Sequence, residues 1–154
     1  EMCIRDRFNG TFNGKNNEIK NIYVKAASYA GVFGAVWGTI ENLTVSGNIT
    51  STTECAGGIV GKSVGNIYNC CNKATIQGYD YTGGIGGAVW ATAGVPLVIN
   101  CKNEGNIIST NKEVGGIVGG SSGEVTNCYN TGKVTGYSYT RRNNRSIVTK
   151  GKSN

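Results

Sequence analysis

Aliphatic and polar residues alternate in short runs along the chain, and the same runs recur at regular intervals. Phrases related to "G-x-I-x-N-C" read "GTIENL" at residues 38–43, "GNIYNC" at 65–70 and "GEVTNC" at 123–128, with a shortened copy, "LVINC", at residues 97–101. Alternation of this kind indicates a β-strand that buries one face. No segment shows a helical period long enough to count, so the pattern predicts an all-β chain.

Two further phrases repeat in the same register. One is rich in glycine ("AGVFG", "AGGIVG", "TGGIGG", "VGGIVGG", beginning at residues 30, 56, 82 and 114), and the other resembles "SGNIT" or "TGKVTG". One unit is therefore about 26 residues with three strand-like runs, separated by Gly and Asn, which accept left-handed turns most easily. Such a unit cannot bury its aliphatic face alone, but stacked units can. We predict a parallel β-helix (β-solenoid) of about four coils of three short strands, right-handed by the usual crossover rule.

The two ends of the chain are interpreted as lying outside this fold. Residues 1–7 contain "MCIRD", which reads as a translated adapter from sequencing-library preparation and is excluded from the fold. The phrase "GYSYTRRNNR" matches "GYDYTGGIGG" only through its threonine, and a one-base shift after Thr140 restores a Gly-rich phrase. Residues 141–154 are therefore predicted to be a frameshifted or disordered basic tail without packed strands. The solenoid is assigned to residues 8–140.

This division changes the electrostatic interpretation of the chain. The formal net charge is +6, but the eight basic and seven acidic residues between Phe8 and Thr140 leave only +1. A strongly basic domain would favour nucleic acid or anionic membrane as a partner. Because the excess positive charge lies in residues 141–154, which are interpreted as outside the fold, we expect neither nucleic-acid binding nor membrane insertion.

Two repeats, "GGIVGKSVGNIYNCCNKATIQG" and "GGIVGGSSGEVTNCYNTGKVTG", resemble GLUG-type repeats. These repeats occur in large bacterial surface and secreted proteins, including stretches beside immunoglobulin-A-cleaving metallopeptidase domains. The run "FNGTFNGKNNEIKNIYV" at residues 8–24 resembles the lead-in of such arrays. The resemblance covers residues 8–140 and implies a bacterial, cell-surface or secreted module that stacks on flanking repeats of the same chain. It carries over no activity, since the recurring residues are structural.

Two columns of residues are predicted to run along the stack. Asparagines take one position in successive coils, and their amides can bond to one another in a structural ladder at a corner, with ligand binding as the alternative. Cysteines follow three of them directly, in a slot that elsewhere holds Leu43 or Ile22, so a buried thiol column is favoured. The ladder residues are Asn42, Asn69, Asn100 and Asn127, with Asn21 upstream, and the thiols are Cys70, Cys101 and Cys128.

Disulfide and metal sites are the alternatives for these thiols. Stacked strands place Cα atoms ~4.8 Å apart, within the range of a disulfide, but three thiols in one column cannot all pair. The chain has no histidine and no C-x-x-C spacing, so neither a zinc site nor any other cofactor is expected.

Aromatic residues are the candidates for ligand contact. "GAVW" occurs twice and ends at Trp37 and Trp90, which can serve as sugar-stacking platforms or, as we favour, as packing over the core. The tyrosines Tyr79 and Tyr81, and likewise Tyr137 and Tyr139, alternate along the chain and are predicted to share a side. If that side faces outward, it could bind a glycan or a host or other cell-surface protein.

Catalysis has little support in this sequence. Asp80 is the sole aspartate between Phe8 and Thr140, and without histidine the usual nucleophile–base pairs cannot form. We therefore predict a non-enzymatic structural or adhesive module of a surface or secreted protein. The alternatives are a non-catalytic fragment of a carbohydrate-active β-helix enzyme and an ice-binding solenoid. The irregular outward residues argue against ice binding.

Overall fold

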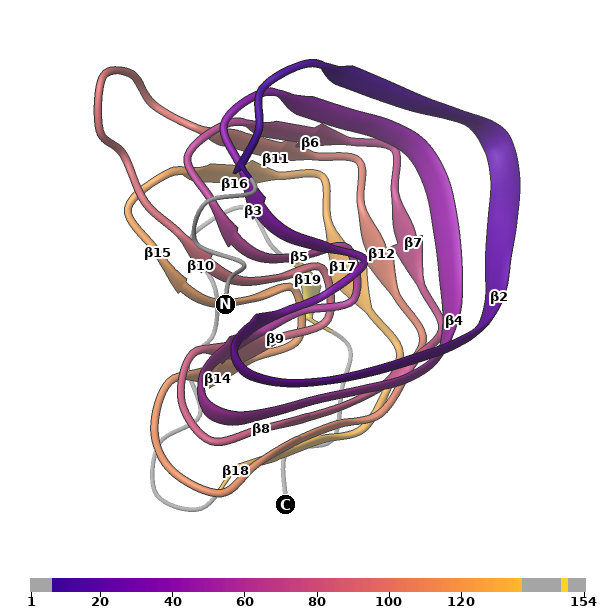
Figure 1. Ribbon diagram of the computed structural model, residues 1–154, viewed down its shortest axis with the longest axis vertical. Helices are drawn as coiled ribbons and strands as arrows, with labels where there is room; N and C mark the ends of the chain where they lie inside the picture. Colours follow the sequence, from indigo (N-terminus) through magenta and orange to yellow (C-terminus); the bar gives the residue numbers. More distant parts are fainter. Residues whose placement is uncertain (1–6, 137–147, 150–154) are drawn as a thin grey trace.

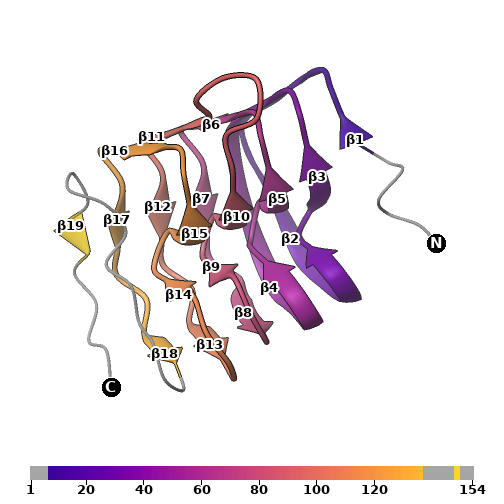
Figure 2. The same ribbon diagram turned by 90° about the vertical axis from the view of Figure 1, so that its left-hand side faces the viewer.

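The computed structural model describes residues 7–136 and 148–149, and its regular structure there consists of strands alone. They form an all-β solenoid of about five turns, which confirms the predicted fold class. Figure 1 looks along the stack of turns, and Figure 2 shows the turns side by side.

One wall of the solenoid is a parallel sheet of five strands in the order β1–β3–β5–β10–β15. Figure 2 shows these strands lying next to one another, one from each turn. Equivalent residues of the repeats stack in register: Phe33 pairs with Val60, which pairs with Gly86, which pairs with Val118. The strands are β1 (Arg7–Phe8), β3 (Phe33–Val36), β5 (Val60–Ser63), β10 (Gly86–Val89) and β15 (Val118–Ser121).

The remaining walls belong to a second parallel sheet that wraps around the stack. Its first two turns are continuous strands, β2 (Thr11–Ala30) and β4 (Thr39–Ala56), which pair along their length with three register shifts. Later turns divide the same path into short strands. These are β6 (Asn66–Tyr68), β7 (Cys71–Asn72), β8 (Thr75–Gly78), β9 (Thr82–Gly83), β11 (Leu97–Ile99), β12 (Lys102–Asn103), β13 (Ile107–Ser109), β14 (Val114–Gly115), β16 (Glu124–Thr126), β17 (Tyr129–Asn130), β18 (Val134–Gly136) and β19 (Val148–Thr149).

The structure refines the predicted coil in two respects. There are about five turns rather than four, because the lead-in segment forms a complete first turn of its own through β1 and β2. A turn also holds up to five short strands rather than three, as β5 to β9 show. Asn69 and Tyr81, which take left-handed backbone angles, lie at two of the additional breaks, although Asn42 and Cys55 take similar angles inside the continuous strand β4.

The interior consists of two apolar clusters, one in each lobe of the turn outline visible in Figure 1. The larger cluster, here called the upper core, contains columns such as Ile40, Ile67, Val98 and Val125, all fully buried. The smaller one, the lower core, contains Ile49, Ile76 and Ile107. Full burial of each such side chain stabilises the fold by about 1.5–3 kcal/mol. The repeated aliphatic positions of the sequence thus become stacked columns.

The predicted domain limits fall largely outside the described residues. Residues 1–6, 137–147 and 150–154 are not described, and the proposed adapter and frameshift origins stay predictions. Arg7, however, forms β1 with Phe8 and pairs with Ala35, so the solenoid includes at least this residue before the assigned start. Val148 and Thr149 form β19 and pair in parallel with β17, so the tail is not free of strands. The right-handed sense of the coil also stays a prediction.

Candidate functional site

A buried ladder of asparagines, Asn72, Asn103 and Asn130, lies at the boundary between the two cores. Each is at most 1% exposed. The side-chain amide of Asn72 donates to Oδ1 of Asn103 at 2.8 Å, and that of Asn103 donates to Oδ1 of Asn130 at 2.6 Å. Each amide also donates to the carbonyl two residues ahead and accepts from the N–H there. These local bonds fix the orientation of every amide, so all ladder donors run towards the C-terminus.

A glycine stands opposite each ladder asparagine. A Cβ at Gly58 would lie 2.2 Å from Oδ1 of Asn72, and a Cβ at Gly84 would lie 2.4 Å from Cγ of Asn103. Gly116 has the same relation to Asn130, with Cβ at 2.7 Å from the asparagine Cβ. No larger residue fits there. The second glycine of each "GG" phrase therefore exists to make room for the ladder.

Sequence reasoning missed this ladder, although the sequence carries a signal for it. Asparagine recurs three residues after Asn69, Asn100 and Asn127, in "NCCN", "NCKN" and "NCYN". In each of these units the Gly-rich phrase has two adjacent glycines. In the preceding unit the phrase is "AGVFG", and the register position of Asn72 is taken by Val45. Both Val32 and Val45 belong to the upper core. Gly and Asn are thus replaced together by two valines.

The asparagines predicted to form a ladder at a corner lie at an outer corner of the turns. Asn42, Asn69, Asn100 and Asn127 have φ of 55°, 54°, 57° and 52°, the left-handed region that asparagine tolerates. Two bonds of the predicted kind are present, since Asn42 donates to Asn13 and Asn69 donates to Asn42, both at 3.2 Å. These bonds are solvent-exposed, so the recurrence of asparagine here is explained mainly by backbone geometry.

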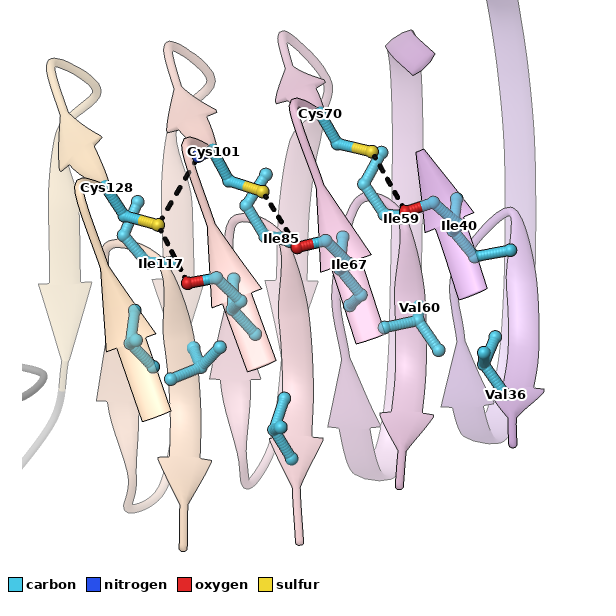
Figure 3. Close-up of a cluster of buried hydrophobic side chains, with 14 of the residues drawn as sticks. Val36, Ile40, Ile59, Val60, Ile67, Cys70, Ile85, Cys101, Ile117 and Cys128 are labelled. Carbon is cyan, nitrogen blue, oxygen red and sulfur yellow. Dashed lines mark hydrogen bonds between the residues drawn. The ribbon is translucent and has the colours of Figure 1, made fainter. Parts of the chain in front are cut away.

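The three predicted thiols form one buried column, shown in Figure 3. Cys70, Cys101 and Cys128 are 2%, 1% and 2% exposed and carry free thiols. Each Sγ–H donates to the carbonyl two residues before it, at 3.2–3.4 Å. The backbone N–H of Cys101 donates to Sγ of Cys128 at 3.4 Å. Burial raises the pKa of the Cys101 thiol well above its ordinary value, so it is protonated at neutral pH and is a poor nucleophile.

Trp90 packs edge-on against Tyr81 at the outer face of β10. Their ring centroids are 5.6 Å apart at an interplanar angle of 85°. A Cβ at Gly120 would lie 2.8 Å from Tyr81 and 3.0 Å from Trp90, so this glycine leaves the space that the two rings fill. Both residues are half-buried. The ring pair is therefore part of the packing and also presents a remaining surface to solvent.

The other predicted aromatic contacts are distributed over separate places. The Arg7 guanidinium lies 4.8 Å from the ring centroid of Trp37 and covers one face of it. Tyr79 is 46% exposed and lies with Tyr81 between β8 and β9, where φ of 45° at Tyr81 breaks the alternation assumed from the sequence. Tyr137 and Tyr139 lie outside the described residues.

A second contact between an aromatic ring and a charged side chain involves the corner position that Tyr81 occupies. Tyr29, Cys55 and Tyr81 take the same left-handed corner position in successive turns. The Lys62 ammonium lies 5.7 Å from the centroid of the Tyr29 ring. Burial and the nearby Glu54 carboxylate raise the pKa of Tyr29, and the same two causes raise the pKa of Cys55 to about 12.

We call Tyr29, Glu54, Lys62, Tyr81 and Trp90 the aromatic corner. Its rings and charged groups are of the kind that stack on and hydrogen-bond to a sugar or a polar protein surface. Among the described residues, no group of three or more His, Cys, Asp or Glu side chains is placed to hold a metal ion. In the same part of the chain no helix of membrane-spanning length and apolarity is found.

Comparison with known proteins gives two matches. Residues 110–135 match the model of the GLUG motif. The chain is also similar to halomucin of Haloquadratum walsbyi (strain DSM 16790 / HBSQ001), with 37% identity over 141 residues that cover 74% of this chain. The chain spans only 2% of the length of halomucin. No solved structure matches the chain.

These matches support the GLUG part of the resemblance. The matched residues 110–135 run from just before β14 into β18 and include Gly116 and Asn130, a facing pair at the ladder. The relative is archaeal, so the bacterial origin stays a prediction. No match connects the chain with immunoglobulin-A-cleaving peptidases, and that part of the resemblance stays a prediction as well.

Proposed function

We propose that this chain is a structural and adhesive repeat module of a much longer cell-surface or secreted protein. Halomucin is a large extracellular or surface protein, and the chain resembles a small region of it. The observation that carries the proposal is that the repeated residues serve the structure of the stack. Glycine, asparagine and cysteine recur because they build and fill the stack, as Gly84, Asn103 and Cys101 show within one turn.

The module acts without catalysis. General acid–base chemistry at neutral pH requires groups that gain and lose protons there, and the chain contains no histidine. The buried Cys101 thiol stays protonated because burial raises its pKa. Asp80 is the sole aspartate between Phe8 and Thr140. The residues thus favour a stalk that displays a surface over an enzyme.

The aromatic corner is the binding face of the module. It combines the exposed part of the Tyr81–Trp90 pair with the Lys62–Tyr29 contact and the Glu54 carboxylate. Aromatic faces stack on the apolar side of a sugar ring, while charged groups bond its hydroxyls. A glycan is therefore the partner we test first, and another cell-surface protein is the second.

The test is a glycan and polysaccharide panel with the purified full chain. We expect binding without turnover. Trp90→Ala should abolish binding, and Trp90→Phe, which keeps a ring against Tyr81, should retain most of it. Equal binding by all three proteins would place the binding face elsewhere.

The same panel addresses the enzymatic alternative. Release of reducing ends from any polysaccharide, lost on Asp80→Asn, would identify the chain as part of a carbohydrate-active enzyme and overturn the proposal. Asp80 lies next to Tyr81 and accepts its backbone N–H at 3.1 Å, so a matched control is needed. Glu124→Gln, at an exposed position on β16, serves that purpose.

A further inference from the structure

The two end faces of the solenoid differ, and the difference gives the stack a direction. Within the described residues, the last ladder asparagine towards the C-terminal face is Asn130, which is 1% exposed. Its amide donates one hydrogen bond, to the carbonyl of Gly132 at 2.9 Å. Asn72 and Asn103 use their second hydrogen for the next asparagine, whereas that of Asn130 has no acceptor within the described part of the chain. A buried donor without an acceptor costs stability.

At the other face the ladder is closed by apolar residues. The register position before Asn72 is Val45, fully buried in the upper core, and the one before that is Ile19. No ladder donor points towards this face, because Asn72 directs its amide to Asn103. A further asparagine placed there would meet the side chain of Ile19 rather than an amide.

The first turn also carries features that protect an end. Phe8 and Phe12 pack against Phe33, with centroids 5.3 and 5.2 Å apart, and cover the upper core with rings where later turns have smaller residues. The end strand β2 has three register shifts, and Lys15, Lys20 and Lys25 on it are exposed. Lysines and bulges on an edge strand oppose pairing with another strand.

We propose that the C-terminal face is a docking surface for a further GLUG coil that supplies an asparagine to the ladder, and that the N-terminal turn is a cap on which no coil stacks. The edge of β17 is compatible with a parallel strand in register, since β19 pairs there, Tyr129 with Val148 and Asn130 with Thr149, and an incoming coil would take this position from β19. The asparagine of the incoming coil accepts the second amide hydrogen of Asn130 through its side-chain Oδ1. This inference rests on the proposed stalk role.

The experiment extends the full chain by one turn at either end. A copy of residues 110–136 inserted after Gly136 continues the register, because Gly136 pairs with Ser109 and the last two ladder asparagines, Asn103 and Asn130, are 27 residues apart. We expect the melting temperature to rise by about 4 °C or more. The same insert with Leu in place of its ladder asparagine should lose most of that gain.

The matched insert at the other end is a copy of residues 93–119 placed directly before Arg7, which has the register of Gly120. It should give no gain in melting temperature. Equal gains at both ends would overturn the proposed direction, and equal gains from the Asn and Leu inserts would overturn the ladder contact. Neither result would affect glycan binding by the unextended chain, so the two proposals fail separately.

A second measurement needs no insertion. In the full chain, NMR hydrogen exchange of the side-chain amides should be faster for Asn130 than for Asn103. Exchange as slow at Asn130 as at Asn103 would show that its amide already has a partner, which would sink the proposal. Sedimentation of the full chain should show a monomer. In an end-to-end dimer, a second copy of the chain would have to dock its β2 edge, which carries exposed lysines, onto the C-terminal face of the first. End-to-end dimers would contradict the cap.

Discussion

The side-chain amide of Asn103 bonds to Oδ1 of Asn130 at 2.6 Å in a position where neither residue meets solvent. The strands that carry them, β12 and β17, pair in register, so one side-chain bond reports the alignment of two whole turns. Buried amides of this kind favour one register because a slip would leave donors and acceptors unpaired.

Asn103→Ala should therefore destabilise the protein strongly. It removes the partner of the Asn72 amide and of Asn130 Oδ1, as well as the two local bonds to Gly105. We expect a loss of about 2–4 kcal/mol in the free energy of unfolding, measured by urea titration. The control is Asn100→Gly at the exposed corner, where glycine accepts φ of 57° and the change should stay within about 0.5 kcal/mol. Equal losses would mean that the buried ladder has no special role.

Gly84→Ala should destabilise by a different route. The added methyl group would lie 2.4 Å from Cγ of Asn103 and 2.5 Å from the carbonyl oxygen of Gly116, and neither can move without disturbing its own bonds. Overpacking of this kind costs about 1–3 kcal/mol. Gly94→Ala is the matched control, because no atom lies within 4 Å of its Cβ position. The melting temperatures of both variants measure this difference. An unchanged melting temperature for Gly84→Ala would refute the proposed reason for the double glycine.

The fold could be predicted from the sequence because each turn of a solenoid repeats the same pattern of buried positions. Ile40, Ile67, Val98 and Val125 each predict little, but their recurrence at one place in the unit predicts a column. The number of strands per turn was harder to predict. A two-residue strand such as β7 has no alternation of its own, and it is defined by pairing with β4 and β12 rather than by local pattern.

The buried polar ladder was not predicted from the sequence, although the ladder expected at the corner is present in two bonds. Asn69 and Asn72 both recur, and periodicity alone does not distinguish a residue that recurs for its backbone angle from one that recurs for its side-chain bonds. The distinguishing fact is the facing Gly58, and this contact between residues distant in sequence appears only after folding. Tyr81 and Trp90 of the aromatic corner were predicted as contact residues. The contact of Lys62 with Tyr29 was missed, since these residues come from different turns.

The thiols should differ sharply in reactivity in the folded protein. Cys71 is half-buried on the outer side of β7, whereas Cys70, Cys101 and Cys128 are buried in the column. Among these four, a soluble alkylating reagent should modify Cys71 first, and the column thiols only after denaturant is added. Peptide mapping after timed alkylation measures this. Fast modification of all three column thiols in native buffer would show that the column is open to solvent.

Alkaline pH should weaken the fold through Cys55. Its thiol is 4% exposed, and burial followed by the Glu54 carboxylate raises its pKa from the ordinary 9.0 to about 12. A raised pKa means that the folded state holds the proton more tightly than the unfolded state, so this contribution is complete below pH 9 and is lost as the pH rises towards 12. Between these limits, each such thiol lowers the free energy of unfolding by about 1.4 kcal/mol per pH unit. Buried Cys101 acts in the same direction.

Urea titrations at several pH values from 8 to 10.5 measure this slope, with Cys55→Ala as the comparison. The variant is less stable at pH 8, because a buried side chain is shortened, but its stability should fall less steeply above pH 9. The difference in slope should approach one proton, since Cys55 is the group removed. Parallel curves of unfolding free energy against pH for the two proteins would mean that Cys55 ionises equally in the folded and unfolded states. The thiol would then not be buried at this corner as described.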